Sequence, residues 1–169
     1  MIRRDGKTVF IFPSNLAGRH DFWASKIARY EFGAEYGVAR GLTGDAYGIP
    51  IWEEDERTFR PIEDIEADVR TMFDVAAERS GTKFFVSTLG FSALAAVCPL
   101  ARTVEMFIGA PDNVLLPPRW KHIRNRLLNR RSARMSETAD LIRKASAAVP
   151  GVLVDTDCGR QPEQQEMVL

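Results

Sequence analysis

Residues 9–20 constrain the fold more than any other part of this chain. Val9-Phe10-Ile11-Phe12 is a β-branched and aromatic run that predicts a buried strand at about 7–13, ended by Pro13. Small and polar residues follow, and then a helical pattern covers 21–34. In α/β proteins such a strand–loop–helix unit often holds a ligand, because loop N–H groups and the helix N-terminus converge there on anions. An ordinary strand-to-helix turn is the alternative.

Size and composition predict a single globular domain. The chain has 169 residues, of which 45% are hydrophobic and 27% charged, enough to build one core. No apolar run is long enough to cross a bilayer and no signal peptide is recognisable, so we expect a cytoplasmic protein without membrane contact. Cys98 and Cys158 are too few for a disulfide scaffold or a zinc site, and we expect no metal and no cofactor.

Strand and helix patterns alternate after the first helix, which Gly33 is expected to end. The expected strands lie at 47–51, 83–89, 113–116 and 152–154, and the expected helices at 61–80, after 90–93 as far as Gly109, and between 121 and 148. Residues 53–56 are expected to form an acidic solvent loop. This alternation predicts an α/β fold with a largely parallel sheet flanked by helices. We expect a core over 1–120, and a basic helical extension with a short strand and a polar tail over 121–169.

Five motifs then suggest a family. They are Phe12-Pro13-Ser14-Asn15-Leu16-Ala17-Gly18-Arg19-His20, Phe32-Gly33-Ala34, Gly41-Leu42-Thr43-Gly44, Tyr47-Gly48-Ile49-Pro50 and Asn113-Val114-Leu115-Leu116-Pro117. In this order, over about residues 7–120, they resemble a family of short bacteriophage and bacterial proteins often named phage non-structural proteins. The family's glycine loops look like those of macro domains, which bind ADP-ribose. The resemblance therefore implies a macro-like fold and an ADP-ribose-like ligand in a bacterial or phage-infected cell.

Two loops depart from the family pattern. Asp21-Phe22-Trp23 stands where the family has G-x-G, and Phe91 stands in a second loop where the family has small residues. Glycine lets a phosphate approach the backbone, so Trp23 and Phe91 are expected to add bulk, and Asp21 a negative charge, where the ligand would lie. Either the pocket is rebuilt for another ligand or it is filled, and the departures slightly favour loss of the ancestral ligand.

The predicted site lies in the loops 13–21, 41–45 and 90–93. The expected ligand-binding residues are Ser14, Asn15, Gly18, Arg19, Thr43, Gly44, Gly90, Phe91 and Ser92. If the ligand is turned over, hydrolysis would use Asn15 and His20 as catalytic residues. Each has a structural alternative, which is an Asx turn for Asn15 and a hydrogen bond within the loop for His20. Paired carboxylates, zinc-ligand spacing and a Walker-type loop are absent from the sequence.

A basic segment over 119–134 follows the predicted core. Its seven cations are Arg119, Lys121, Arg124, Arg126, Arg130, Arg131 and Arg134, although the formal net charge of the chain is zero. Such a segment could track the phosphates of a nucleic acid. Ile123, Leu127 and Leu128 add an apolar stripe, which favours docking on the protein's own domain or on a protein partner.

Two functions are therefore predicted. The first is a nucleotide-type ligand-binding protein with weak or no hydrolase activity. The alternative is a non-enzymatic interaction protein whose pocket is occluded, which acts through Arg119 to Arg134 on a protein or nucleic-acid partner or on a second copy of itself. An open pocket between Asn15 and Gly90 would favour the first function, and a pocket plugged by Trp23 or Phe91 the second.

Overall fold

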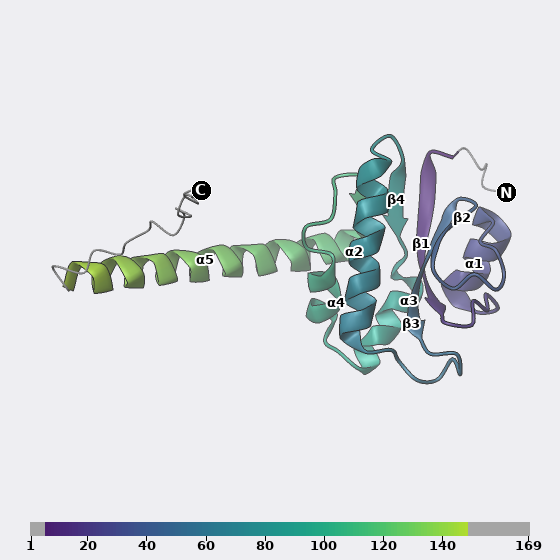
Figure 1. The fold of residues 1–169 in the computed structure, drawn as a ribbon, viewed down its shortest axis with the longest axis horizontal. Coiled ribbons are helices and arrows are strands. Elements are labelled where there is room, and N and C mark those ends of the chain that lie inside the picture. Colours follow the sequence, from purple (N-terminus) through teal and green to yellow (C-terminus); the bar gives the residue numbers. More distant parts are fainter. Residues whose placement is uncertain (1–5, 149–169) are drawn as a thin grey trace, which may run out of the picture. The chain divides into compact units, whose positions relative to one another are not determined.

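A five-stranded sheet forms the centre of the structure, a computed structural model that describes residues 6–148 (Figure 1). The strands are β1 (Thr8–Asn15), β2 (Gly41–Thr43), β3 (Ala46–Trp52), β4 (Lys83–Val86) and β5 (Val114–Leu115). Their order is β2-β3-β1-β4-β5, and every neighbouring pair is parallel except β2 with β3. The predicted α/β class with a largely parallel sheet is confirmed.

Five helices and a 3₁₀ turn connect and follow these strands. They are α1 (Trp23–Phe32), α2 (Ile62–Glu78), the short α3 (Thr88–Phe91), the 3₁₀ turn Ser92–Ala96, α4 (Leu100–Met106) and α5 (Pro118–Ala148). Strand β4 ends at Val86, earlier than expected. The predicted strand at 152–154 and the polar tail lie outside the described residues. Contacts define one compact unit that ends at Asn129 and a second that begins at Arg130.

The core has one hydrophobic cluster on each face of the sheet. Side chains of β1 alternate between the two, because successive residues of a strand point to opposite faces. Phe10 and Phe12 pack with Ala24 and Ala28 of α1. Val9 and Ile11 belong to a larger cluster with α2, α4 and the start of α5. Strand β1 is therefore covered on both sides, as its continuous apolar run requires.

The order of the strands creates a topological switch point beside β1. The connection that leaves β1 through α1 leads to β3 on one side, whereas the connection that leaves β4 through α3 and α4 leads to β5 on the other side. Where two such connections diverge, the carboxyl ends of the two central strands leave a crevice, and open α/β sheets bind their ligands there. Here the crevice lies between the ends of β1 and β4.

Two glycines make this arrangement possible. Gly33 ends α1 as predicted, with φ 74° and its N–H donated to the carbonyl of Ala28. Gly90 has φ 100°, and a Cβ at this position would overlap Pro13 at the end of β1. The segment after β4 therefore lies directly against the end of β1, which confirms that the ends of these two strands lie side by side at one edge of the sheet.

Candidate ligand pocket at the switch point

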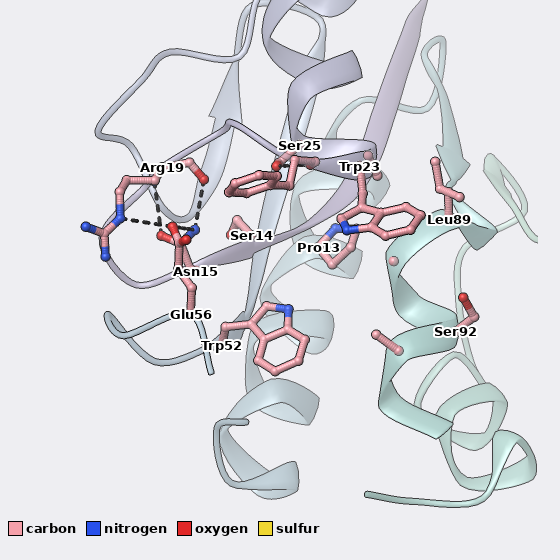
Figure 2. A pocket seen from close by; sticks show the side chains of 14 residues that line it. Pro13, Ser14, Asn15, Arg19, Trp23, Ser25, Trp52, Glu56, Leu89 and Ser92 are labelled. Carbon is pink, nitrogen blue, oxygen red and sulfur yellow. Dashed lines mark hydrogen bonds and ion pairs between the residues drawn. The ribbon is translucent and has the colours of Figure 1, made fainter. Parts of the chain in front are cut away.

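A cavity of about 420 Å³ lies at this edge of the sheet. Its floor is the end of β1, from Pro13 to Asn15, and its walls come from the first turn of α1, from Trp52 at the end of β3, and from Leu89, Gly90, Ser92 and Ala93 (Figure 2). Ligand sites of proteins commonly have volumes of about 300–1,000 Å³. The cavity therefore has the size and the position of a small-molecule site.

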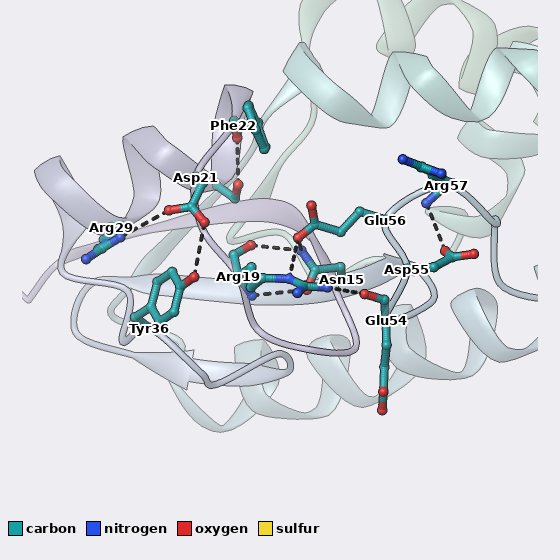
Figure 3. A network of polar contacts seen from close by, with 11 residues as sticks. Asn15, Arg19, Asp21, Phe22, Arg29, Tyr36, Glu54, Asp55, Glu56 and Arg57 are labelled. Carbon is teal, nitrogen blue, oxygen red and sulfur yellow. Dashed lines mark hydrogen bonds and ion pairs between the residues drawn. The ribbon is translucent and has the colours of Figure 1, made fainter.

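Asn15 organises the loop at one end of the pocket (Figure 3). Its Nδ2 donates to the carbonyl of Arg19 at 2.8 Å and to Oε1 of Glu56 at 3.0 Å. Its Oδ1 accepts the backbone N–H of Arg19 at 3.0 Å. Both amide hydrogens are therefore engaged within the protein, and the Asx-turn interpretation accounts for this side chain.

Glu56 belongs to the same polar network. Its Oε1 also accepts from Nε of Arg19 at 2.9 Å, while Nη2 of Arg19 donates to the carbonyl of Glu54. Glu54 and Asp55 are exposed, as expected of a solvent loop, but these contacts hold Glu56 against the end of β1. Asp55 shapes the same loop, and hydrogen bonds from Thr58 and Arg57 lower its pKa to about 2.

The N-terminus of α1 opens onto the pocket without a capping side chain. Residues 22–25 line the cavity, and the N-cap residue Phe22 offers no side-chain acceptor. The first helical N–H to bond is that of Lys26, to the carbonyl of Phe22 at 3.2 Å. The preceding N–H groups of α1 are left for other partners, and such groups favour anions.

Asp21 does not oppose an anion there. Its carboxylate forms an ion pair with Nη1 of Arg29 at 3.3 Å and accepts a hydrogen bond from the hydroxyl of Tyr36 at 3.1 Å. Asp21 is not among the residues that line the pocket. The hydrogen bond to Asp21 raises the pKa of Tyr36. The expectation that Asp21 places a negative charge where the ligand would lie is therefore wrong, because its carboxylate is engaged by Arg29 and Tyr36.

The two aromatic replacements leave the pocket open. Trp23 lines it with 74% of its surface exposed, whereas Phe91 is 1% exposed and packs in the core at 5.9 Å from Phe107, ring centre to ring centre. Trp52, which is stacked on Phe59 at 3.7 Å, supplies a second indole to the lining. Figure 2 shows Trp23 and Trp52 on either side of Pro13. The structure therefore contradicts the alternative in which Trp23 and Phe91 fill the pocket.

Both lining residues Trp23 and Glu56 have an unusual backbone. Their φ angles are 51° and 60°, and no other non-glycine residue of the described range 6–148 has a positive φ. A left-handed conformation costs an L-residue about 1–2 kcal/mol. Strain of this kind gathers at functional sites, where the surrounding structure maintains it. Its restriction to two residues of one cavity marks this cavity as the candidate site.

Among the predicted site residues, five meet at the pocket. They are Ser14, Asn15, Arg19, Gly90 and Ser92. Thr43 and Gly44 are not among its lining residues, because the antiparallel turn from β2 leads into the start of β3, whereas the pocket lies where β1 and β3 end. Thr43 Oγ1 instead accepts the N–H of Glu35 at 3.1 Å.

Gly18 and His20 support the loop from behind. Gly18 has φ 65° and packs directly against the backbone of Gly37. His20 is fully buried, with Nε2 at 3.1 Å from the carbonyl of Val38, and its Nδ1 has no hydrogen-bond partner in the structure. Burial lowers the pKa of His20. Neither residue lines the pocket. The structural alternative, a buried side chain hydrogen-bonded to the backbone, therefore describes His20.

Sequence reasoning missed Trp52 and Glu56. Both follow the predicted strand 47–51, and this position was a usable signal, because the carboxyl end of a strand next to β1 must lie at the same edge as Asn15. What the sequence did not show is that this strand pairs with β1 at all.

Three further observations bear on this site. The described residues contain no group of three or more His, Cys, Asp or Glu side chains arranged to hold a metal ion. No helix within residues 6–148 has the length and apolar character needed to cross a membrane. No family model, curated protein or solved structure matches this chain, so the family resemblance and the macro-domain analogy stay predictions.

Proposed function

We propose that this protein binds a nucleotide-type small molecule in the switch-point pocket. The observation that carries the proposal is the chemistry that one open cavity combines, namely the uncapped start of α1, the Arg19 guanidinium and the indoles of Trp23 and Trp52. An uncapped helix start suits a phosphate. An exposed indole suits a base, because stacking on an aromatic ring contributes about 1–3 kcal/mol per base.

The proposal concerns binding rather than turnover. His20, the expected acid or base, is fully buried away from the lining, and the amide of Asn15 is engaged by Arg19 and Glu56. A general acid or base must come within hydrogen-bond reach of the ligand. The geometry of these two residues therefore supports a structural role for both.

Calorimetric titration with AMP, ADP and ADP-ribose tests the proposal. We expect saturable one-to-one binding of at least one of them, weakened about tenfold or more in Trp23→Ala through the loss of stacking. Tyr30→Ala is the matched control, because Tyr30 is an exposed aromatic residue of the same helix that does not line the pocket. Absence of binding by all three nucleotides, or an equal loss in both variants, would refute the proposal.

The basic segment supports a second candidate function, nucleic-acid binding. Arg119, Lys121, Arg126, Arg130 and Arg134 are exposed and pair with no acidic side chain within the described residues. Ile123 and Leu127 pack against the larger core cluster, which leaves these cations to solvent. A gel shift with duplex and single-stranded DNA and RNA tests this function. Tight binding that weakens steeply with salt and is lost in Arg130→Glu with Arg134→Glu would support it. Absence of binding at physiological salt would exclude it.

A further inference from the structure

We infer that the pocket selects ribonucleotides, with the Glu56 carboxylate as the acceptor for the ribose diol. This inference rests on the proposed function, since it names the part of the nucleotide that Glu56 would contact. Glu56 lies in the loop after β3, the strand that runs parallel to β1, and its side chain lines the cavity. In dinucleotide-binding α/β sheets, an acidic side chain about 20 residues beyond the glycine-rich turn hydrogen-bonds the ribose 2′-OH, and Glu56 offers the same chemical group here.

The carboxylate is held in one orientation by its neighbours. Oε1 accepts from Nδ2 of Asn15 at 3.0 Å and from Nε of Arg19 at 2.9 Å, whereas Oε2 takes part in neither contact. Two donors on one oxygen fix the rotation of the group before a ligand arrives. An ionised carboxylate is an acceptor with several lone pairs, and a vicinal diol offers two O–H donors, so the two groups are complementary.

The backbone of Glu56 supports the same assignment. At φ 60° a glycine or an asparagine would fit with less strain than a glutamate. The loop nevertheless presents a long acidic side chain there. A requirement for the carboxylate at this place explains why the strain is kept, and the contacts of Oε1 show what holds the side chain in position.

The arrangement predicts discrimination at the 2′ position of the sugar. A 2′-deoxynucleotide leaves the carboxylate with one donor fewer, and a 2′-phosphate brings a second negative charge against it. The α1 N-terminus and Trp23 lie elsewhere in the lining and contact other parts of the nucleotide. Removing the Glu56 carboxylate should therefore reduce selectivity for the sugar, whereas binding of the phosphates and the base should persist.

Calorimetry with ADP and 2′-deoxy-ADP tests the inference. We expect the native protein to prefer ADP by about 10- to 100-fold, the range for a hydrogen bond to a charged acceptor. Glu56→Gln keeps an oxygen for Asn15 and Arg19 but loses the charge, and it should reduce the preference to a fewfold. Glu56→Gly should abolish it and, because glycine accepts φ 60°, should fold normally. Glu54→Gln is the control, because that exposed side chain of the same loop does not line the pocket, and its preference should equal the native one.

The outcomes separate the two levels of the argument. Equal affinity of the native protein for both nucleotides would overturn the role of the diol while the nucleotide site stands. A preference that survives in both Glu56 variants would assign selectivity to another residue and also overturn the inference. If neither ADP nor 2′-deoxy-ADP binds, the inference fails, and the titrations with AMP and ADP-ribose decide whether the proposed function fails with it.

Discussion

Replacing Trp23 by glycine and by alanine tests directly whether strain is stored at the mouth of the pocket. Both variants remove the same indole, of which about a quarter of the surface is buried, so the lost burial is common to both. They differ in the cost of φ 51°, which is about 1–2 kcal/mol for alanine and close to zero for glycine. We therefore expect Trp23→Gly to be more stable than Trp23→Ala by about 1 kcal/mol. The usual order in helices is the reverse, with alanine better by about 1 kcal/mol.

Urea denaturation, followed through the fluorescence of the buried Trp120, measures the difference. The slope of unfolding free energy against urea should be the same in both variants, because the surface exposed on unfolding hardly changes. Both variants should also lose nucleotide affinity to the same extent, since both lack the ring. An alanine variant as stable as the glycine variant, or more stable, would show that residue 23 does not hold a left-handed backbone and would remove strain from the argument.

Four other perturbations follow from the same geometry. Asn15→Ala removes three hydrogen bonds and should lower the free energy of unfolding by about 1–3 kcal/mol in chemical denaturation. Gly90→Ala should destabilise the fold by more than about 1 kcal/mol, because the new Cβ overlaps Pro13 at φ 100°, and a thermal melt close to the native one would contradict this. The pKa of His20 is lowered by burial, so the protein should lose stability as the pH falls below about 6.5, and His20→Gln should flatten that slope. Because the Asp55 pKa is depressed to about 2, the contribution of its carboxylate should be lost progressively as the pH falls from about 3.8 through that value, and an NMR titration of Thr58→Val should show the pKa returning toward 3.8.

The alternation of strands and helices was predictable because it depends on local patterns. The apolar run over 9–12 is buried on both faces of the sheet, and Gly33 ends α1 in a left-handed conformation. Each of these features is encoded within a few residues of sequence. The helix expected between 94 and 109 is instead a 3₁₀ turn followed by α4, which begins after Pro99. Proline at this point cannot continue a preceding helix, and the physical reason for the break was therefore available in the sequence.

The site was only partly predictable because it depends on strand order. Asn15 and Gly90 could be paired, since both follow the most strand-like runs, and the structure brings them to one pocket. Thr43 and Gly44 were misplaced because a glycine turn has the same composition at either edge of a sheet. Phe91 was taken for a pocket residue because no local pattern shows that its ring turns toward Phe107 and Trp120. Glu56 was hidden for the complementary reason, since its acidic neighbours suggested a solvated loop.

The shortness of the two outermost strands has a consequence for self-association. Strand β2 spans three residues and β5 only two, whereas the central β1 spans eight. A strand from another molecule can add to a sheet only along an outer strand with a continuous row of free N–H and C=O groups. Outer strands of two and three residues offer too short a row for such pairing. Over residues 6–148, the part of the chain that the structure describes, short outer strands therefore protect the sheet from edge-to-edge pairing, while the longest strand lies in the middle.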